Sequence, residues 1–286
     1  MATNSTAVHR VRSESRPELG GFWSSLLRPF GVDILCLDHK FLVYNLVVKG
    51  LKMRYRGSAL GVLWTLLIPI FTALTYFIIF KFVIRFQHDN YINYLLSGLL
   101  PWTFFATSLN VGTESLVFHH DLLRKVPMPI HVFPLTETVK AFANFLAGVP
   151  LLMLLSLATG EPIVSWSLFQ LFPLLILLFI QAYGFALTSA VFFVFLRDLR
   201  HAVTFFLQIW MYATPILYPL EMIPDRFVWI PYLNPLTFVI EGFHSVFTGK
   251  VMSLEHWGVA ILWTLILFYL PIKMYAVRKN RIIESL

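Results

Sequence analysis

Polar and aromatic side chains recur on single faces of two otherwise apolar stretches, residues 61–84 and 202–219, and they are the best candidates for chemistry in this sequence. Aromatic rings present flat apolar faces to sugar C–H groups, while hydroxyl and amide groups bind sugar hydroxyls. Such faces therefore suit a carbohydrate better than an ion. Plain packing between helices through polar residues is the alternative, and the residues alone do not decide. The candidate lining residues are Trp64, Thr72, Tyr76, Gln208, Trp210 and Tyr212.

Motifs for catalysis or metal binding are missing from the sequence. There is no G-x-x-x-x-G-K-[ST] loop, no H-E-x-x-H and no pair of Asp-rich motifs that would hold magnesium and a diphosphate. His119, His120 and Asp121 form a run, but adjacent histidines on a helix point apart. Cys36 is the single cysteine, so no cysteine-based metal site can form. We expect no metal site, no catalytic residue and no cofactor in this chain.

The composition indicates a polytopic membrane protein. Of the 286 residues, 58% are hydrophobic and only 13% are charged, about half the charged fraction of a soluble domain. This excludes a disordered or collagen-like chain and argues against a soluble enzyme. A net charge of +7 would suggest nucleic acid in a soluble protein, but here it raises the question of which membrane side carries the cations, and we expect no nucleic-acid partner.

Helical spans of roughly 20 apolar residues predict an all-α fold. Placing the N-terminus inside puts 18 of the 22 Lys and Arg residues on the cytoplasmic side, which fits the positive-inside rule. We therefore expect both termini in the cytoplasm, with residues 1–31 as a flexible tail before a transmembrane domain at 32–286. The predicted spans are 61–84, 95–116, 133–158, 168–196, 202–219 and 257–275.

Three segments outside the spans are expected to be helical. Residues 32–56 are too charged to span and fit an amphipathic helix in the membrane interface. The stretch His119–Pro134 predicts a short cytoplasmic helix at His119–Val126, followed by prolines that stop it. That helix could dock a soluble partner or could be an ordinary proline-rich connector. Between the fifth and sixth spans, prolines predict two short re-entrant helices, at Pro224–Ile230 and Pro235–Phe247.

Several motifs, taken together and in order, resemble ABC type-2 permeases that export polysaccharides such as O-antigen, teichoic acid and capsule. The resemblance covers about residues 33–280 and leaves the N-terminal tail without a role. Its motifs are RYRGSALGVLWTLLIP (54–69), GLLPWTFF (98–105), LLRKVPMPIHVFPL (122–135), LRDLRH (196–201) and NPLT (234–237).

The resemblance implies a homodimer of six-span subunits in a bacterial cytoplasmic (inner) membrane, with two copies of a separate cytoplasmic ATPase that uses ATP and magnesium. The implied substrate is a glycan on a polyprenyl diphosphate lipid. Arg54 and Arg56 become candidates for the diphosphate, since guanidinium binds phosphate well; simple obedience to the positive-inside rule is the alternative. The helix before Arg54 resembles the interfacial gate helix of the family. The implied ATPase-coupling residues are His119, His120, Asp121, Leu122, Arg124 and Lys125.

Two other functions stay open at this point. An ABC type-2 permease for drugs or simple lipids would share the architecture but lack a long polar and aromatic channel. A membrane enzyme acting on polyprenyl-linked sugars would need a carboxylate or metal constellation at one membrane face, and the sequence offers none. The sequence does not identify the glycan, or whether transport is processive or occurs in one step.

Overall fold

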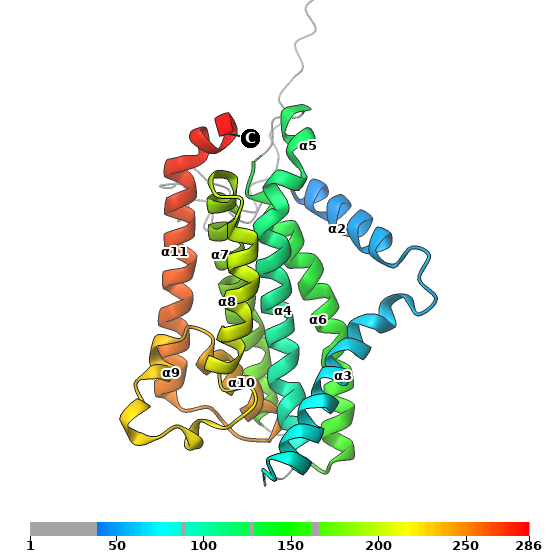
Figure 1. The fold of residues 1–286 in the computed structure, drawn as a ribbon, viewed down its shortest axis with the longest axis vertical. Helices are drawn as coiled ribbons and strands as arrows, with labels where there is room; N and C mark the ends of the chain where they lie inside the picture. The colour runs from blue at the N-terminus through cyan, green and yellow to red at the C-terminus, as the bar shows by residue number, and fades with distance from the viewer. Residues whose placement is uncertain (1–38, 87–89, 126–128, 162–165, 286) are drawn as a thin grey trace, which may run out of the picture.

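The described part of the chain is helical throughout. A computed structural model describes residues 39–86, 90–125, 129–161 and 166–285, and within these ranges no strand occurs. The long helices run side by side along the molecule (Figure 1). One end carries α5 (His120–Lys125) and the C-terminus of α11 (Leu254–Ser285), and the other carries α9 (Ile230–Leu233) and α10 (Thr237–Phe247). These are called the α5 end and the α10 end below.

Within the part of the chain that the structure describes, four helices are long and apolar enough to cross a membrane. Their backbone groups are bonded within the helix, which is what a hydrocarbon environment requires. They correspond to the first, third, fourth and sixth predicted spans. They are α3 (Trp64–Ile78) continued by the π-helix η4 (Ile79–Val83), α6 (Val132–Ala158), the 3-10 turn η5 (Trp166–Gln170) continued by α7 (Leu171–Phe195), and α11 as far as Arg278.

The second and fifth predicted spans are also helical, as α4 (Tyr91–Phe118) and α8 (Leu199–Ala213), but neither is among these four. At about 1.5 Å per residue, the 15 residues of α8 extend only about 22 Å, less than a bilayer core of about 30 Å. The predicted end of this span at residue 219 is wrong, because the helix ends at Ala213 and the chain turns from Thr214 onward. A count of six crossings therefore stays a prediction.

Helix α4 lies at the centre of the bundle. It packs most extensively against α6 and α7 and also contacts α3, α8 and α10. Gly112 allows α4 and α7 to approach closely, because a Cβ at this position would lie 2.7 Å from the Cβ of Ala186. Small residues at such crossings are typical of helices that associate in membranes. The residues of α4 from Asn93 to Trp102 are all buried.

The predicted interfacial helix is present as α2 (Lys40–Tyr55), which leans away from the bundle at the α5 end (Figure 1). Residues 32–38 of the predicted helix lie outside the described residues, as does the predicted tail 1–31. Leu42, Val43 and Leu46 pack toward the bundle. Phe41 and Tyr44 are exposed, so apolar residues occur on both sides of α2. The expected division into one apolar and one polar face is therefore wrong.

The predicted coupling helix is observed as α5, with one correction. His119 belongs to the end of α4, where its backbone N–H donates to the carbonyl of Ser115, so the helix begins at His120 rather than His119. Val126 lies outside the described residues. Asp121 is exposed and Leu122 is half-buried.

The connection between α8 and α11 has less helix than the sequence predicts. The predicted helix Pro224–Ile230 is wrong: this segment contains the 3-10 turn η7 (Asp225–Phe227), preceded by η6 (Leu220–Met222). The predicted helix Pro235–Phe247 is confirmed as α10, which begins at Thr237. Side chains of α4 bond the carbonyl groups of this region: Tyr91 donates to Leu217 (2.8 Å), Tyr94 to Tyr218 (2.9 Å) and Asn93 to Phe247 (3.0 Å).

Candidate substrate-binding groove

Three adjoining cavities follow one side of α4 from the α5 end toward the middle of the bundle. The first and second have volumes of about 440 Å³ each and share Val111, Glu137 and Lys140 as lining residues. The third has a volume of about 180 Å³ and shares Arg54, Thr107 and Ala141 with the second. Because neighbouring cavities share walls, we treat them together as the groove.

The first cavity is bordered by paired polar side chains from α4 and α8. Arg200 on α8 lies 3.0 Å from the carboxylate of Glu114 on α4, and both side chains are partly exposed. One turn further along each helix, the hydroxyl of Thr204 donates to Asn110 at 3.2 Å. These two contacts join the start of α8 to α4 beside the opening of the cavity.

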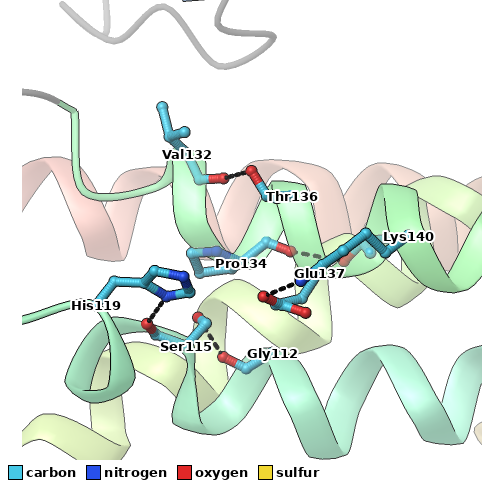
Figure 2. Close-up of polar contacts among 9 residues, drawn as sticks. Gly112, Ser115, His119, Val132, Pro134, Thr136, Glu137 and Lys140 are labelled. Carbon is cyan, nitrogen blue, oxygen red and sulfur yellow. Dashed lines mark hydrogen bonds and ion pairs between the residues drawn. The ribbon is translucent and has the colours of Figure 1, made fainter. Parts of the chain in front are cut away.

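His119 closes the α5 end of the first cavity. Its ring Nδ1 lies 2.9 Å from the carbonyl oxygen of Ser115, and the ring stacks on Phe133 with centroids 4.7 Å apart. Figure 2 shows this end of α4 facing Glu137 and Lys140 on α6. His119 is thus held between α4 and α6 and contributes to the groove, whereas the sequence assigned it to coupling.

The second cavity lies between α2, α4 and α6. Glu137 and Lys140 form an ion pair at 2.6 Å, with side chains 9% and 19% exposed. Arg54, on the last turn of α2, lines the same cavity. Three charged side chains therefore line this cavity together with the apolar residues Leu51, Met53, Val111 and Ala141.

The third cavity continues between α3, α4 and α6. Trp64, Thr65 and Asn144 are among its lining residues. Asn144 also accepts a hydrogen bond of 2.8 Å from the hydroxyl of Tyr55, which fastens the end of α2 to α6. Aromatic, hydroxyl and amide groups thus occur together in this part of the groove.

The structure separates the two predicted headgroup residues. Arg54 lines the second and third cavities. Arg56 is exposed at the C-cap of α2 and lines none of the three cavities described above. A role for Arg56 at the groove therefore has no support in the geometry, and Arg54 is the better candidate of the two.

The predicted channel-lining residues lie in several different environments. Tyr76 on α3 and Tyr212 on α8 have hydroxyl oxygens 3.5 Å apart. Gln208 is exposed on α8. Trp64 lines the third cavity, whereas the hydroxyl of Thr72 donates to the carbonyl of Ile68 in its own helix.

The prediction for Trp210 is wrong. Its side chain is 8% exposed, and its ring packs edge-on against Trp102 and Phe105. The indole Nε1 donates to the side chain of Asn234 at 3.0 Å. Trp210 is therefore a core residue, and the face of α8 that remains exposed carries Thr204, Gln208 and Tyr212.

The sequence analysis missed the Glu137–Lys140 pair as a site feature. A signal was present: a glutamate and a lysine three residues apart face the same side of a helix, and ionisable residues within an apolar span are functional candidates. In the sequence analysis Lys140 serves only as one of the 18 Lys and Arg residues placed on the cytoplasmic side. The approach of α2, which completes the second cavity, could not be read from the spacing.

The comparisons with known proteins agree with this architecture. The family model described as "ABC-2 type transporter" matches residues 42–248, which is more than half of the chain. The O-antigen export system permease protein RfbA of Myxococcus xanthus is 35% identical over 239 residues, covering 79% of this chain and 90% of the relative. RfbA of Klebsiella pneumoniae is 31% identical, covering 83% and 92%. The polysialic acid transport protein KpsM of Escherichia coli is 24% identical, covering 86% and 96%.

The chain therefore belongs to the ABC-2 type transporter family. It is a multi-pass membrane protein and a permease, that is, a transport subunit rather than an enzyme.

Proposed function

We propose that this chain is the membrane permease of an ATP-driven exporter that moves a polysaccharide, carried on a polyprenyl diphosphate lipid, out of the bacterial cytoplasm across the inner membrane. The relatives named as O-antigen export permeases and as a polysialic acid transport protein support a glycan substrate. The groove carries the proposal, because it joins a cation, Arg54, to an aromatic and amide lining.

The active unit in this proposal is a homodimer with two copies of a cytoplasmic ATP-binding subunit, in which ATP and magnesium act. The exposed apolar faces of α3 and α8 support an assembly around these helices. Only 11% of the α3 span is buried, against 61% of the α7 span. Large exposed side chains on the two helices are Ile68, Phe71, Ile78, Phe205, Ile209 and Tyr212.

The proposed mechanism begins at the α5 end, on the cytoplasmic side, with six crossings and both termini inside. The lipid diphosphate enters beside α2 at Arg54. ATP-driven closure of the partner pushes on α5, and the interface formed by α3 and α8 opens. The glycan then follows along the exposed side of Tyr76, Gln208 and Tyr212. The short elements between α8 and α11 line the exit.

The test separates the pathway from the coupling element. A Tyr76→Ala/Tyr212→Ala variant should lose most surface polysaccharide, because it removes both hydroxyls and both rings that meet between α3 and α8. It should still co-purify with the ATP-binding protein encoded beside it. A variant with Asp121, Arg124 and Lys125 all changed to Ala should instead lose that complex, since α5 is the proposed docking element.

Surface polysaccharide is measured by immunoblotting in source cells that lack the chromosomal copy, with pull-down of the tagged ATPase. Tyr269→Ala is the matched control, because this tyrosine is exposed on α11, away from both helices. Normal export in the double-tyrosine variant would refute the pathway. Failure of the wild-type chain to form a complex with any neighbouring ATPase would refute the proposed partnership with that subunit.

A further inference from the structure

The ion pair between Glu137 and Lys140 occupies an unusual place for a structural contact. Both side chains are largely buried on α6, a candidate span, yet they border two cavities. A buried ion pair contributes little net stability, because desolvation offsets much of the attraction between the charges. Ionisable residues inside a membrane segment are functional candidates for the same reason. The location of the Glu137–Lys140 pair therefore suggests that it interacts with a ligand in the cavity rather than only stabilising the fold.

Gly50 on α2 leaves the space that Lys140 occupies. A Cβ at Gly50 would lie 2.7 Å from Cδ of Lys140 and 3.0 Å from its Nζ, too close for a real side chain. The lysine therefore reaches across from α6 to α2 through the gap that this glycine provides. Gly50 and Arg54 are one helical turn apart, so they lie near the same face of α2.

The second cavity consequently brings two cations from different helices to one space. Arg54 and Lys140 line it together with a single carboxylate, that of Glu137. The amine of Lys140 is bonded to Glu137 at 2.6 Å. A guanidinium and an ammonium that converge on one cavity fit phosphate oxygens, which they bind through charge-assisted hydrogen bonds.

We propose that Lys140, together with Arg54, binds the phosphate groups of a diphosphate ligand in this cavity. Glu137 is the internal counter-ion that holds Lys140 while the cavity is empty, and it competes with the ligand for the ammonium group. Gly50 is a positioning residue that keeps the path of Lys140 open. This inference rests on the proposed function for the identity of the ligand, while the residues that bind it are argued from the cavity alone.

The test relies on opposite expected changes in diphosphate affinity when Lys140 and Glu137 are replaced. Lys140→Met should weaken binding by about tenfold or more, because it removes a charge-assisted hydrogen bond. Glu137→Gln should tighten binding severalfold, because it frees Lys140. Lys140→Arg should restore most of the affinity, and Gly50→Leu should weaken binding by displacing the lysine.

Binding is measured with the full chain in phosphatidylcholine nanodiscs, titrated with a polyprenyl diphosphate in one arm and with inorganic diphosphate in the other. Lys273→Met, an exposed lysine on α11, is the matched control for loss of a charge. Dependence on the variants in the lipid arm supports a lipid headgroup, and the same dependence in the inorganic arm alone supports a free diphosphate. Thermal unfolding of each variant identifies any that fail to fold.

Equal loss of binding in Lys140→Met and Glu137→Gln would overturn the proposal, since a merely structural pair predicts that result. Unchanged binding in Lys140→Met, or no binding by the wild-type chain in either arm, would also overturn it. The proposed export function would stand in these cases if the Tyr76→Ala/Tyr212→Ala variant still blocked export. Normal export in that variant, with the Lys140 effects intact, would leave a diphosphate site without the proposed glycan pathway.

Discussion

The two ends of α4 bury polar side chains in different ways. At the α10 end, His244 is 2% exposed, with its ring nitrogens 2.8 Å from the hydroxyl of Ser97 and 3.0 Å from the carbonyl oxygen of Pro215. Its ring also stacks on Tyr94, with centroids 3.8 Å apart. At the α5 end, by contrast, the ion pairs of Glu137 and Glu114 border open cavities.

Polar side chains in this bundle therefore fall into two groups: some bond the backbone of an irregular segment, and others border a cavity. At the α10 end, the chain between Thr214 and Leu236 is mostly irregular, and its carbonyl groups need partners because lipid supplies none. Tyr91, Tyr94 and His244 supply them and fix the segment. At the α5 end the surrounding chain is mostly helical, and the charged side chains pair with one another beside the cavities instead of bonding irregular backbone.

The largest expected effect on the free energy of unfolding comes from removing the hydrogen bonds of His244 at the α10 end. His244→Leu leaves the buried Pro215 carbonyl without this partner, at a cost of about 1–3 kcal/mol, and also removes the ring that stacks on Tyr94, while the Ser97 hydroxyl keeps its bond to the carbonyl of Tyr94. We expect a loss of about 2–4 kcal/mol in the free energy of unfolding, measured by titrating the chain into mixed SDS micelles. Ser97→Ala, which leaves the His244 bond to Pro215 and the stack on Tyr94 in place, should cost clearly less. A stability loss no greater than that of Ser97→Ala would contradict the comparison.

A smaller effect is expected from Glu241 on α10. Burial and, to a smaller extent, nearby Glu221 raise the pKa of this carboxyl group from 4.5 to about 7, against an opposing effect of Lys250. The folded state therefore holds the proton more tightly than the unfolded state, and this contribution to stability is present below about pH 4.5 and is lost as the pH rises through 7.

Glu241→Gln should accordingly flatten the dependence of the unfolding temperature on pH between 5 and 8. The measurement is a series of thermal scans in detergent at fixed ionic strength. Asp225→Asn controls for the loss of another carboxylate at the same end, since Asp225 is exposed in η7. A pH dependence identical to that of the wild-type chain would exclude a raised pKa for the carboxyl group at position 241.

The smallest effect on stability is expected from removing the ion pair between Glu114 and Arg200 at the α5 end. Their side chains are 40% and 59% exposed, so solvent screening reduces the attraction. A double-mutant cycle with Glu114→Gln and Arg200→Met should give a coupling energy of only about 0.2–1 kcal/mol. Unfolding in mixed SDS micelles measures it. A coupling as large as the cost of His244→Leu would erase the distinction between the two ends.

The sequence predicted the fold well where one apolar run makes one helix. The stretches that became α3, α6, α7 and α11 are continuous apolar segments, and α10 was found from its flanking prolines. Prediction failed at Pro224–Ile230, because prolines and a short apolar run fit a helix as well as two turns. The end of α8 at Ala213 depends on hydrogen bonds to Asn234, which spacing cannot reveal.

The candidate site was predicted only in part, for a related reason. Arg54 was recognised from its motif, and Tyr76 and Tyr212 from their helical faces. Trp210 shares its face pattern with a lining residue, but the aromatic neighbours that bury it come from α4 and α7. The second cavity requires α2 to fold back on α6, a tertiary contact carried by Gly50 and Lys140 that leaves no mark in local sequence.

The hydrogen bonds of α4 at its α10 end also set an order of events in synthesis. Tyr91 is bonded to a residue 126 positions later in the chain, and Asn93 to one 154 positions later. At about 5–20 residues per second, the ribosome needs roughly 8–30 s after making Asn93 to supply its partner. Until then the side-chain amide of Asn93 lacks this partner, so a chain truncated before Phe247 cannot complete the packing of α4 at its α10 end.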